Sequence, residues 1–353
     1  MISLSPPLQQ VDRTKVLYKG RKLTYFGGCD YFRLSTHPEI HNALETGLRK
    51  YGLNVAASRV TTGNHRLYNE IEEALCDFFG AKAAVFLPSG YAANLAAAEA
   101  LAGNVTHALI HEKSHVSLSS SVRLLGCNVN TFSRLKHLRG SSRPLILTDG
   151  LFARDGEIAP LGEYVDALPR NGLLLVDDAH GAGTLGNKGR GTPEFHGIKT
   201  DRIIQTITLS KAFGVYGGAV LCSQAIREAI VSRSNLFIGQ TPLPLPLVCA
   251  ALRSLQLMRS DRSLRKRLQE NTQFVKAALA DSFTIPGNPS PIISIVPKQI
   301  AGVKEVLLSA EIYPPFIRYP SGPRNGYFRF AISSEHSLAE LSRLVEVLLQ
   351  FRR

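Results

Sequence analysis

Residues able to handle protons and form covalent links stand just after apolar runs that read as buried strands. Asp177 and His180 follow one such run, LLLV, at 173–176. Lys211 follows the next run, and His115 lies beyond an earlier one. A carboxylate, two imidazoles and a primary amine suit acid–base and nucleophilic chemistry. Because the carboxyl ends of parallel strands share one edge of a sheet, we expect these groups to converge there.

A glycine pattern just after this aspartate raises an alternative, a dinucleotide site. Residues 181–186 read Gly-Ala-Gly-Thr-Leu-Gly and match G-x-G-x-x-G. In nucleotide-binding proteins such glycines join a strand directly to a helix, so that a pyrophosphate meets the helix N-terminus. Here four residues, three of them polar, intervene, and the following NKGRGTPEF is too rich in Gly and Pro to open a helix. We therefore assign these glycines to a tight loop beneath the site.

The elements that must position these residues alternate in type between about residues 70 and 225. Short β-rich apolar runs are separated by helix-like segments, which predicts an α/β fold with a mostly parallel, doubly wound sheet. The runs lack period-2 alternation, as is typical of strands buried on both faces. They lie at 83–87, 107–111, 129–132, 144–148, 173–176, 202–207 and 218–223.

A break in this alternation marks a second, smaller domain. Three prolines fall within five residues in GQTPLPLPLV at 239–248, and a long helical pattern, two strand-like pieces and a final amphipathic helix follow. The segment KVLYKGRKLTYF at 15–26 reads as a hairpin with a Lys-Gly turn. We predict a large domain over 41–240 and a small α+β domain built from 1–40 together with 241–353.

Composition excludes several classes of protein. Apolar residues make up 44% of the chain, but no run approaches the ~18 needed to span a bilayer, so we expect no membrane segment. The opening MISLSPPLQQ shows no signal-peptide pattern, and we expect a cytoplasmic protein. The five cysteines form no C-x-x-C pair, which argues against a disulfide frame and a metal site. They are Cys29, Cys76, Cys127, Cys222 and Cys249.

The chain is strongly basic, with a formal net charge of +13. Its Lys and Arg residues are spread along the chain, and the densest clusters lie in helix-like sequence, where a solvated face is the ordinary interpretation. No nucleic-acid-binding motif is present, so we expect no nucleic-acid partner. A basic surface does suit an anionic ligand such as coenzyme A or an acyl carrier.

Taken together, three features favour a site for pyridoxal 5'-phosphate. Ser89, Gly90 and Tyr91 precede an Ala-rich helix whose N-terminus could bind a phosphate. Asp177 at a strand tip could keep a pyridine nitrogen protonated, so that the ring acts as an electron sink. Lys211, among small residues in TLSKAFG, could form a Schiff base. Singly, each has an ordinary alternative as a turn, a helix cap or a surface lysine; the combination predicts the cofactor.

Several motifs in order along the chain resemble the α-oxoamine synthase family of fold-type I pyridoxal phosphate enzymes. The segment CDYFRLSTHPEI at 29–40 is similar to the family's NDYLGLS-x-HP. The others are SRVTTGNHRLYNEIEEAL (58–75), DGLFARDGEIAPL (149–161), DDAHGAGTLGNKGRG (177–191), TLSKAFGVYGGAV (208–220) and FRFAISSEHS (328–337). The resemblance covers nearly the whole chain and implies the fold of a fold-type I pyridoxal phosphate transferase.

The resemblance implies a role for each matching position near the cofactor ring. Lys211 would hold the cofactor as a Schiff base and later move the substrate α-proton. Asp177 would pair with the pyridine nitrogen, and His180 would hydrogen-bond the 3-oxygen. His115 would stack on the ring and help to position the acyl group, and these four are the expected catalytic residues.

Further positions are implied at the phosphate and at the substrate. Gly90 and Tyr91, after Ser89, would hold the cofactor, and Thr208 would reach its phosphate. Arg329 would grip the amino-acid carboxylate as a bidentate partner. Ser321, in YPSGP, matches a position that contacts substrate.

Three positions depart from the family pattern. The usual Asn before Asp-Tyr is Cys29, a Gly-rich segment is replaced by Asn54-Val55-Ala56-Ala57, and a usual Ser is Ala153. These departures leave the lysine, aspartate and histidines in place. They leave open the identity of the substrate.

The family's reaction is the decarboxylative condensation of a small amino acid with an acyl-CoA. We expect a homodimer and an acyltransferase that joins L-alanine to a pimeloyl thioester, carried on CoA or a carrier protein, giving 8-amino-7-oxononanoate in biotin synthesis. Alternatives are a glycine or serine C-acyltransferase, an aminotransferase or lyase, and a catalytically silent relative that binds the cofactor.

Overall fold

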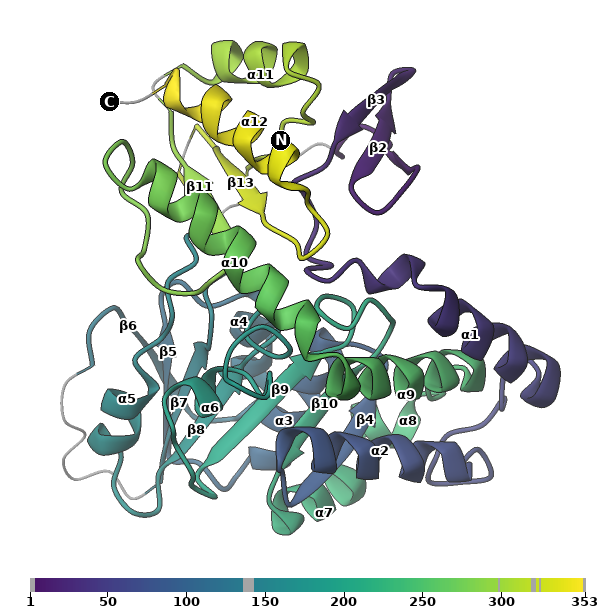
Figure 1. The fold of residues 1–353 in the computed structure, drawn as a ribbon. Coiled ribbons are helices and arrows are strands. Elements are labelled where there is room, and N and C mark those ends of the chain that lie inside the picture. The colour runs from purple at the N-terminus through teal and green to yellow at the C-terminus, as the bar shows by residue number, and fades with distance from the viewer. Residues whose placement is uncertain (1–3, 136–142, 298, 319–321, 324, 352–353) are drawn as a thin grey trace. The chain divides into compact units, whose positions relative to one another are not determined.

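The computed structural model describes residues 4–135, 143–297, 299–318, 322–323 and 325–351. The chain forms two compact units (Figure 1). The large unit comprises His37–Phe152 and Ile158–Asp261. The small unit comprises the N-terminal residues up to Thr36, the short segment Ala153–Glu157 and the residues from Arg262 onward.

A seven-stranded sheet forms the centre of the large unit, in the order β4-β10-β9-β8-β7-β5-β6. In this sheet β10 is antiparallel to both of its neighbours, and the remaining pairs are parallel. Six strands therefore run in one direction, and their carboxyl ends share one edge. The strands are β4 (Ala83–Leu87), β5 (His107–His111), β6 (Asn128–Phe132), β7 (Pro144–Asp149), β8 (Leu173–Asp177), β9 (Ile203–Thr208) and β10 (Gly218–Cys222).

The predicted doubly wound α/β class is confirmed, and each strand begins and ends within one residue of its prediction. The reversed direction of β10 follows from the short connection at 209–217, because a parallel neighbour would need a crossover of a dozen or more residues.

Helices cover both faces of this sheet. Along β7, Leu145 and Leu147 lie in the cluster that includes α3, whereas Ile146 lies in the cluster that includes α5. The large-unit helices are α1 (Pro38–Tyr51), α2 (Arg66–Phe79), α3 (Gly90–Leu101), α4 (Val116–Ser121), α5 (Leu161–Ala167), α6 (Thr192–Phe195), α7 (Gln224–Arg233), α8 (Asn235–Gly239) and α9 (Leu245–Ser260).

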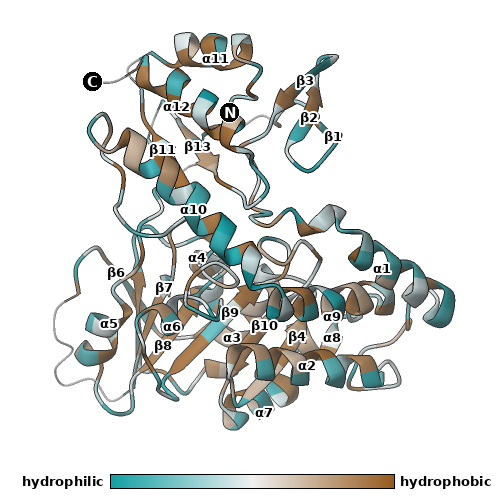
Figure 2. Cartoon of the chain, viewed as in Figure 1, coloured by the Kyte–Doolittle hydropathy of each residue, from teal (hydrophilic) through white to brown (hydrophobic). Residues whose placement is uncertain are grey.

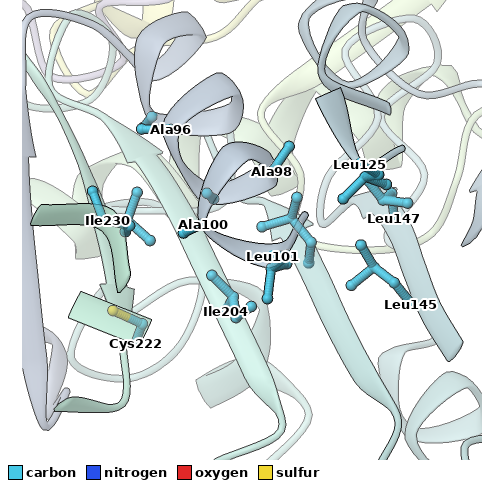
Figure 3. Packing of buried hydrophobic residues seen from close by; sticks show 14 of the residues in the cluster. Ala96, Ala98, Ala100, Leu101, Leu125, Leu145, Leu147, Ile204, Cys222 and Ile230 are labelled. Carbon is cyan, nitrogen blue, oxygen red and sulfur yellow. The ribbon is translucent and has the colours of Figure 1, made fainter. Parts of the chain in front are cut away.

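Helix α3 approaches the sheet closely because its buried face consists mostly of alanine. Figure 3 shows Ala96 and Ala100 of α3 packed among Ile204 and Cys222 of the sheet and Ile230 of α7. These side chains are buried, which removes apolar surface from water and stabilises the layer. In Figure 2 the strands β7 and β8 are correspondingly brown, the colour of hydrophobic residues.

Within the described residues, the small unit contains two three-stranded antiparallel sheets, three α-helices and a short 3₁₀ helix at Leu34–Thr36. In the first sheet β2 and β3 are joined at Lys19-Gly20, both with positive φ (49° and 76°), which confirms the predicted hairpin turn. Its elements are β1 (Gln9–Gln10), β2 (Lys15–Tyr18), β3 (Arg21–Thr24), β11 (Ile292–Ile295), β12 (Phe316–Ile317), β13 (Tyr327–Ala331), α10 (Arg262–Leu279), α11 (Ile300–Ser309) and α12 (Leu338–Leu349).

This unit has its own apolar core, in which Phe26, Phe328 and Phe330 are fully buried. Helix α12 begins at a capping box, in which Ser337 and Glu340 satisfy each other's backbone N–H groups. Across the ranges that the structure describes, no helix of either unit has the length and apolarity to cross a bilayer.

Candidate active site

The predicted cofactor residues gather at one edge of the large-unit sheet. Asp177 ends β8 and Thr208 ends β9, and His180 and Lys211 lie in the loops that follow these strands. Ser89 caps α3 after β4, and His115 caps α4 after β5. Because these strands point the same way, their polar ends form one continuous row, where doubly wound sheets bind ligands.

Lys211 and His180 are in direct contact. The Lys211 Nζ lies 2.8 Å from His180 Nε2, and the His180 side chain is buried. Residue 180 is followed by a turn in which the Thr184 hydroxyl donates to the His180 carbonyl at 2.6 Å. The loop therefore fixes an imidazole beside the amine, as the sequence-based prediction requires.

Two groups donate to the Asp177 carboxylate, and a hydroxyl lies within reach of it. Asn94 Nδ2 donates to Oδ2 at 2.6 Å, and the Ser117 hydroxyl lies 3.3 Å from the same oxygen. The Ala179 N–H donates to Oδ1 at 3.1 Å. Hydrogen bonds to an ionised carboxylate are stronger than neutral ones, so this set orients Asp177 firmly.

Sequence reasoning missed Asn94, which is fully buried in α3. Its Oδ1 accepts a hydrogen bond from the Thr206 hydroxyl at 2.6 Å, and its Nδ2 serves both Asp177 and Ser117. The available signal was a lone amide in the alanine run YAANLAAAEAL. A buried polar side chain in an apolar helix needs partners, and partners at this end of the sheet belong to the site.

The ring of His115 is held by Ser117. Its ring Nδ1 accepts from the Ser117 backbone N–H at 3.2 Å, which places the proton of the neutral ring on Nε2. Burial lowers the pKa of His115, and the Lys211 cation acts in the same direction against the opposing charge of Asp177. The neutral imidazole is therefore favoured, with Nε2–H as a donor.

Asp149, at the end of β7, is a second site residue outside the predictions. It lies level with Asp177 across the β7–β8 pair, and its Oδ1 accepts the His115 backbone N–H at 2.9 Å. Burial raises the pKa of Asp149 well above its ordinary value, and the nearby charge of Asp177 adds to this. Asp149 thus positions His115 while favouring its own neutral form.

The start of α3 forms a cradle for a phosphate. The Ser89 side chain and carbonyl accept the N–H groups of Ala92 and Ala93, which leaves those of Gly90 and Tyr91 to an acceptor outside the helix. A Cβ at Gly90 would come within 2.9 Å of Thr208 Cβ, so glycine is required for this close approach.

Two hydroxyls border this cradle. Thr208 Oγ1 lies 2.8 Å from Ser210 Oγ, a residue that the predictions did not include. The Tyr91 hydroxyl donates to Ser120 Oγ on α4 at 2.8 Å, so its ring is held beside α4. The residues present therefore fit pyridoxal phosphate. They supply an amine, a carboxylate, two imidazoles and a cradle for the phosphate.

Arg329 belongs to the small unit, on β13, and contacts two of the positions that depart from the family pattern, Cys29 through its thiol and Ala153 through its backbone carbonyl. Its Nη1 donates to the Ala153 carbonyl at 3.3 Å, and its Nη2 lies 3.8 Å from Cys29 Sγ. The substitution at position 29 thus places a thiol against the guanidinium. Ser321, the other predicted substrate contact, lies outside the described residues.

The glycine pattern at 181–186 lies in a loop, as predicted, and Gly181 of this loop packs against the buried carboxylate of Asp178. Asp178 accepts from the Thr192 N–H and hydroxyl at 2.8 and 2.6 Å and from Gln205 Nε2 at 2.7 Å. A Cβ on Gly181 or Gly191 would overlap its oxygens. Burial raises the pKa of Asp178 to about 7.

Comparison with known proteins places this geometry in a family. Residues 24–348 match the aminotransferase class I and II family. An 8-amino-7-oxononanoate synthase of Pseudomonas putida (strain F1) is 33% identical over 361 residues, covering 98% of this chain and 92% of the relative.

Solved structures agree in fold. The 8-amino-7-oxononanoate synthase of Francisella tularensis superposes with a TM-score of 0.81 at 26% identity, covering 93% of this chain and 97% of that one. A serine palmitoyltransferase with pyridoxal phosphate gives a TM-score of 0.87 at 25% identity, covering 97% and 90%. This chain accordingly belongs to the class I and II aminotransferase family and is a pyridoxal 5'-phosphate-dependent α-oxoamine synthase of fold type I.

Proposed function

We propose that this enzyme condenses L-alanine with a pimeloyl thioester, with loss of CO2, to form 8-amino-7-oxononanoate in biotin synthesis. The observation that carries the proposal is the near full-length similarity to 8-amino-7-oxononanoate synthases, at 33% identity over 98% of this chain. The basic character of the chain, with a net charge of +13, suits an anionic acyl carrier, whether CoA or a protein.

In this proposal the large unit holds the cofactor through the residues at the sheet edge. Lys211 would bind it covalently, Asp177 would pair with the ring nitrogen and His180 with the 3-oxygen. The first amides of α3 and the Thr208 hydroxyl would receive the phosphate. When bound, pyridoxal phosphate supplies an electron sink for the negative charge that develops on the amino acid's α-carbon.

The chain's own residues then orient reactants and move protons. The Lys211 amine takes the α-proton, and the adjacent His180 imidazole, 2.8 Å away, orients that amine. His115 would pack against the ring and, as a neutral imidazole, would offer its Nε2–H to the carbonyl oxygen of the thioester. Arg329 binds the amino-acid carboxylate through charge-assisted hydrogen bonds.

The second candidate is a serine or glycine C-acyltransferase, because a serine palmitoyltransferase superposes with a TM-score of 0.87. The residue at position 29 affects how the amino-acid substrate is held. A thiol beside Arg329 donates hydrogen bonds only weakly, so this position holds the substrate carboxylate less firmly than an amide would.

A turnover screen decides between the candidates. The cofactor-loaded protein is mixed with L-alanine, glycine or L-serine and with pimeloyl-CoA, palmitoyl-CoA or a pimeloyl carrier protein, and thiol release and product mass are measured. We expect the highest kcat/KM with L-alanine and a pimeloyl thioester. A preference for L-serine and palmitoyl-CoA would assign the second candidate. Cofactor binding without thiol release from any pair would identify a silent relative.

We also propose a homodimer located in the cytoplasm. The large unit exposes bulky apolar side chains at Leu53, Val116 and Tyr216, with exposed fractions of 69%, 53% and 59%. Exposed apolar groups of this size are suited to burial in an interface. Sedimentation analysis should show twice the 38.5 kDa chain mass, and a monomer at micromolar concentration would contradict the proposal.

A further inference from the structure

The Ser117 hydroxyl lies between two residues of the proposed chemistry. Its Oγ is 2.7 Å from His115 Nδ1 and 3.3 Å from Asp177 Oδ2, and the side chain is buried. Asn94 Nδ2 donates a hydrogen bond to Ser117 Oγ at 2.9 Å. Ser117 thus contacts a base on α4, a carboxylate on β8 and an amide on α3.

The Ser117 hydroxyl has one proton, so it can donate a hydrogen bond to only one of its partners at a time. Asn94 Nδ2 can only donate, so Ser117 Oγ accepts from it and has one proton left to give. When His115 is neutral, its Nδ1 is an acceptor and receives that proton over the shorter distance of 2.7 Å. Asp177 then keeps the Asn94 and Ala179 donors without the hydroxyl.

Protonation of His115 reverses the arrangement. A proton on Nδ1 makes the ring a donor to Ser117 Oγ, which frees the hydroxyl proton to turn toward Asp177 Oδ2, 3.3 Å away. Asp177 then gains a hydrogen bond and becomes a weaker partner for any other donor. The proton that Nδ1 takes up comes from solvent and forms an N–H bond, so Nδ1 no longer accepts the Ser117 backbone N–H, and all other changes in this exchange are of hydrogen bonds.

We propose that Ser117 is a positioning residue that couples the protonation of His115 to the hydrogen bonding of Asp177, and so to the charge that Asp177 presents to the cofactor ring nitrogen. This inference rests on the cofactor site proposed above, and it is independent of which amino acid and thioester react.

The charged groups that face His115 come from three elements. Asp177 on β8 and Lys211 in the β9–β10 loop act on its ring, and Asp149 on β7 accepts its backbone N–H. Lys211 in turn contacts His180. Any titration of His115 is read with these four groups present, so the coupling is measured as a difference between variants.

A double-mutant cycle read by the absorption of bound pyridoxal phosphate against pH tests the coupling. We compare the effect of His115→Gln on the titration midpoint in the wild-type and Ser117→Ala backgrounds. In the wild type, His115→Gln should move the midpoint by about half a pH unit or more. In Ser117→Ala the same change should have little effect, and Ser117→Thr, which keeps the hydroxyl, should restore it.

Ser121→Ala is the matched control. Ser121 is a buried serine of the same helix, and its hydroxyl donates to the Leu118 carbonyl at 2.8 Å. Its loss should lower thermal stability and leave the cycle unchanged. An effect of His115→Gln that persists in Ser117→Ala would overturn the proposal, as would a Ser121→Ala effect equal to that of Ser117→Ala.

A second measurement needs no variant. Nitrogen NMR of histidine-labelled holoenzyme reports which ring nitrogen of His115 carries the proton. We expect an unprotonated Nδ1 and a protonated Nε2 above the pKa of His115, and the reverse tautomer would refute the coupling. Because neither readout requires turnover, an enzyme inactive with every thioester would refute the proposed function while the coupling could still be measured.

Discussion

The amide of Asn94 can lie only one way round. The Asp177 carboxylate can only accept a hydrogen bond, so Asn94 must turn its Nδ2 toward Asp177 and Ser117. The reversed amide would set an oxygen against the carboxylate, and the two oxygens would repel each other. With Nδ2 fixed in this way, Oδ1 is left to accept the Thr206 hydroxyl proton on β9.

Replacing Asn94 should weaken both the fold and the cofactor site. Asn94→Ala leaves the buried Thr206 hydroxyl without this acceptor and removes one donor from Asp177, which should cost about 1–3 kcal/mol of unfolding free energy. Affinity for pyridoxal phosphate should fall roughly tenfold, equivalent to about 1.4 kcal/mol. Fluorescence titration and chemical denaturation measure the two effects. Asn130→Ala, on the exposed part of β6, should change neither.

Lys211 should carry the covalent link. Borohydride treatment of the loaded protein should add the mass of reduced cofactor to the peptide that contains Lys211, as seen by mass spectrometry. In Lys211→Ala the increment should vanish and kcat should fall by roughly 10²–10⁴-fold, because proton transfer at the α-carbon loses its base. A mass increment at another lysine of the wild-type protein would contradict the assignment.

Which residues were predictable from sequence depended on where they stand. Asp177, His180 and Lys211 follow apolar runs, so their residue types and their positions after strands indicate a functional site. Asn94 and Ser117 lie inside helices and resemble ordinary packed or capping residues. Their role depends on contacts between α3, α4 and β8, which no local pattern encodes.

Among the elements, the 181–191 loop shows how glycine serves a carboxylate. Gly150, Gly181 and Gly191 all approach Asp178 so closely that a Cβ would collide with its oxygens. Of the three glycines in the G-x-G-x-x-G pattern, Gly181 makes room for Asp178, whereas Gly183 and Gly186 have positive φ and lie against Ala212 and Glu194. Sequence reasoning placed the glycines in a loop but had no means to identify the group around which they pack.

Substitution within this loop should be costly for a steric reason. Gly191→Ala combines a φ of 92° with overlap on Asp178 and Gln205, and should cost about 3 kcal/mol or more. Gly197→Ala is the matched control, because its φ is 66° but nothing lies within 4 Å of the added Cβ. It should cost only about 1–2 kcal/mol. Equal losses of unfolding free energy in urea would show that backbone strain alone matters.

At the scale of the whole molecule, each of the two units depends on its own apolar core. The core of the small unit contains a buried histidine, His336. His336 stacks on Phe26 with ring centroids 4.2 Å apart. Its Nδ1 accepts the Ser333 N–H at 3.0 Å, and its Nε2 donates to the Tyr25 carbonyl at 3.1 Å. This pattern requires a neutral ring, and burial, assisted by the Arg33 cation, lowers the pKa of His336 to about 3.

Acid should therefore destabilise the small unit. Below an unfolded-state pKa of about 6.5 the unfolded chain binds a proton that the folded chain does not, so stability is full above that pH and falls toward pH 3. The slope from this group is at most about 1.4 kcal/mol per pH unit. Urea unfolding at pH 7 and pH 5 measures it. His336→Gln should reduce the slope, and an unchanged slope would contradict the assignment.

The architecture was more predictable than the assembly of these parts. Apolar strand runs and their alternation with helices depend on local sequence, and each strand appears within a residue of its predicted place. The segment Ala153–Glu157, which the small unit takes from the middle of the chain, depends on long-range packing. The periodicity of apolar residues along the chain does not indicate which distant segments pack together.

The β9–β10 hairpin has a practical consequence for engineering. Its register pairs Thr208 with Gly218, so both ends of the nine intervening residues, 209–217, are tied to the same ladder. Lys211 lies in this short connection, three residues beyond Thr208. Inserting one residue into the connection would leave the strand pairing intact but would displace the Lys211 amine. Such a chain would fold normally and yet fail to bind its coenzyme.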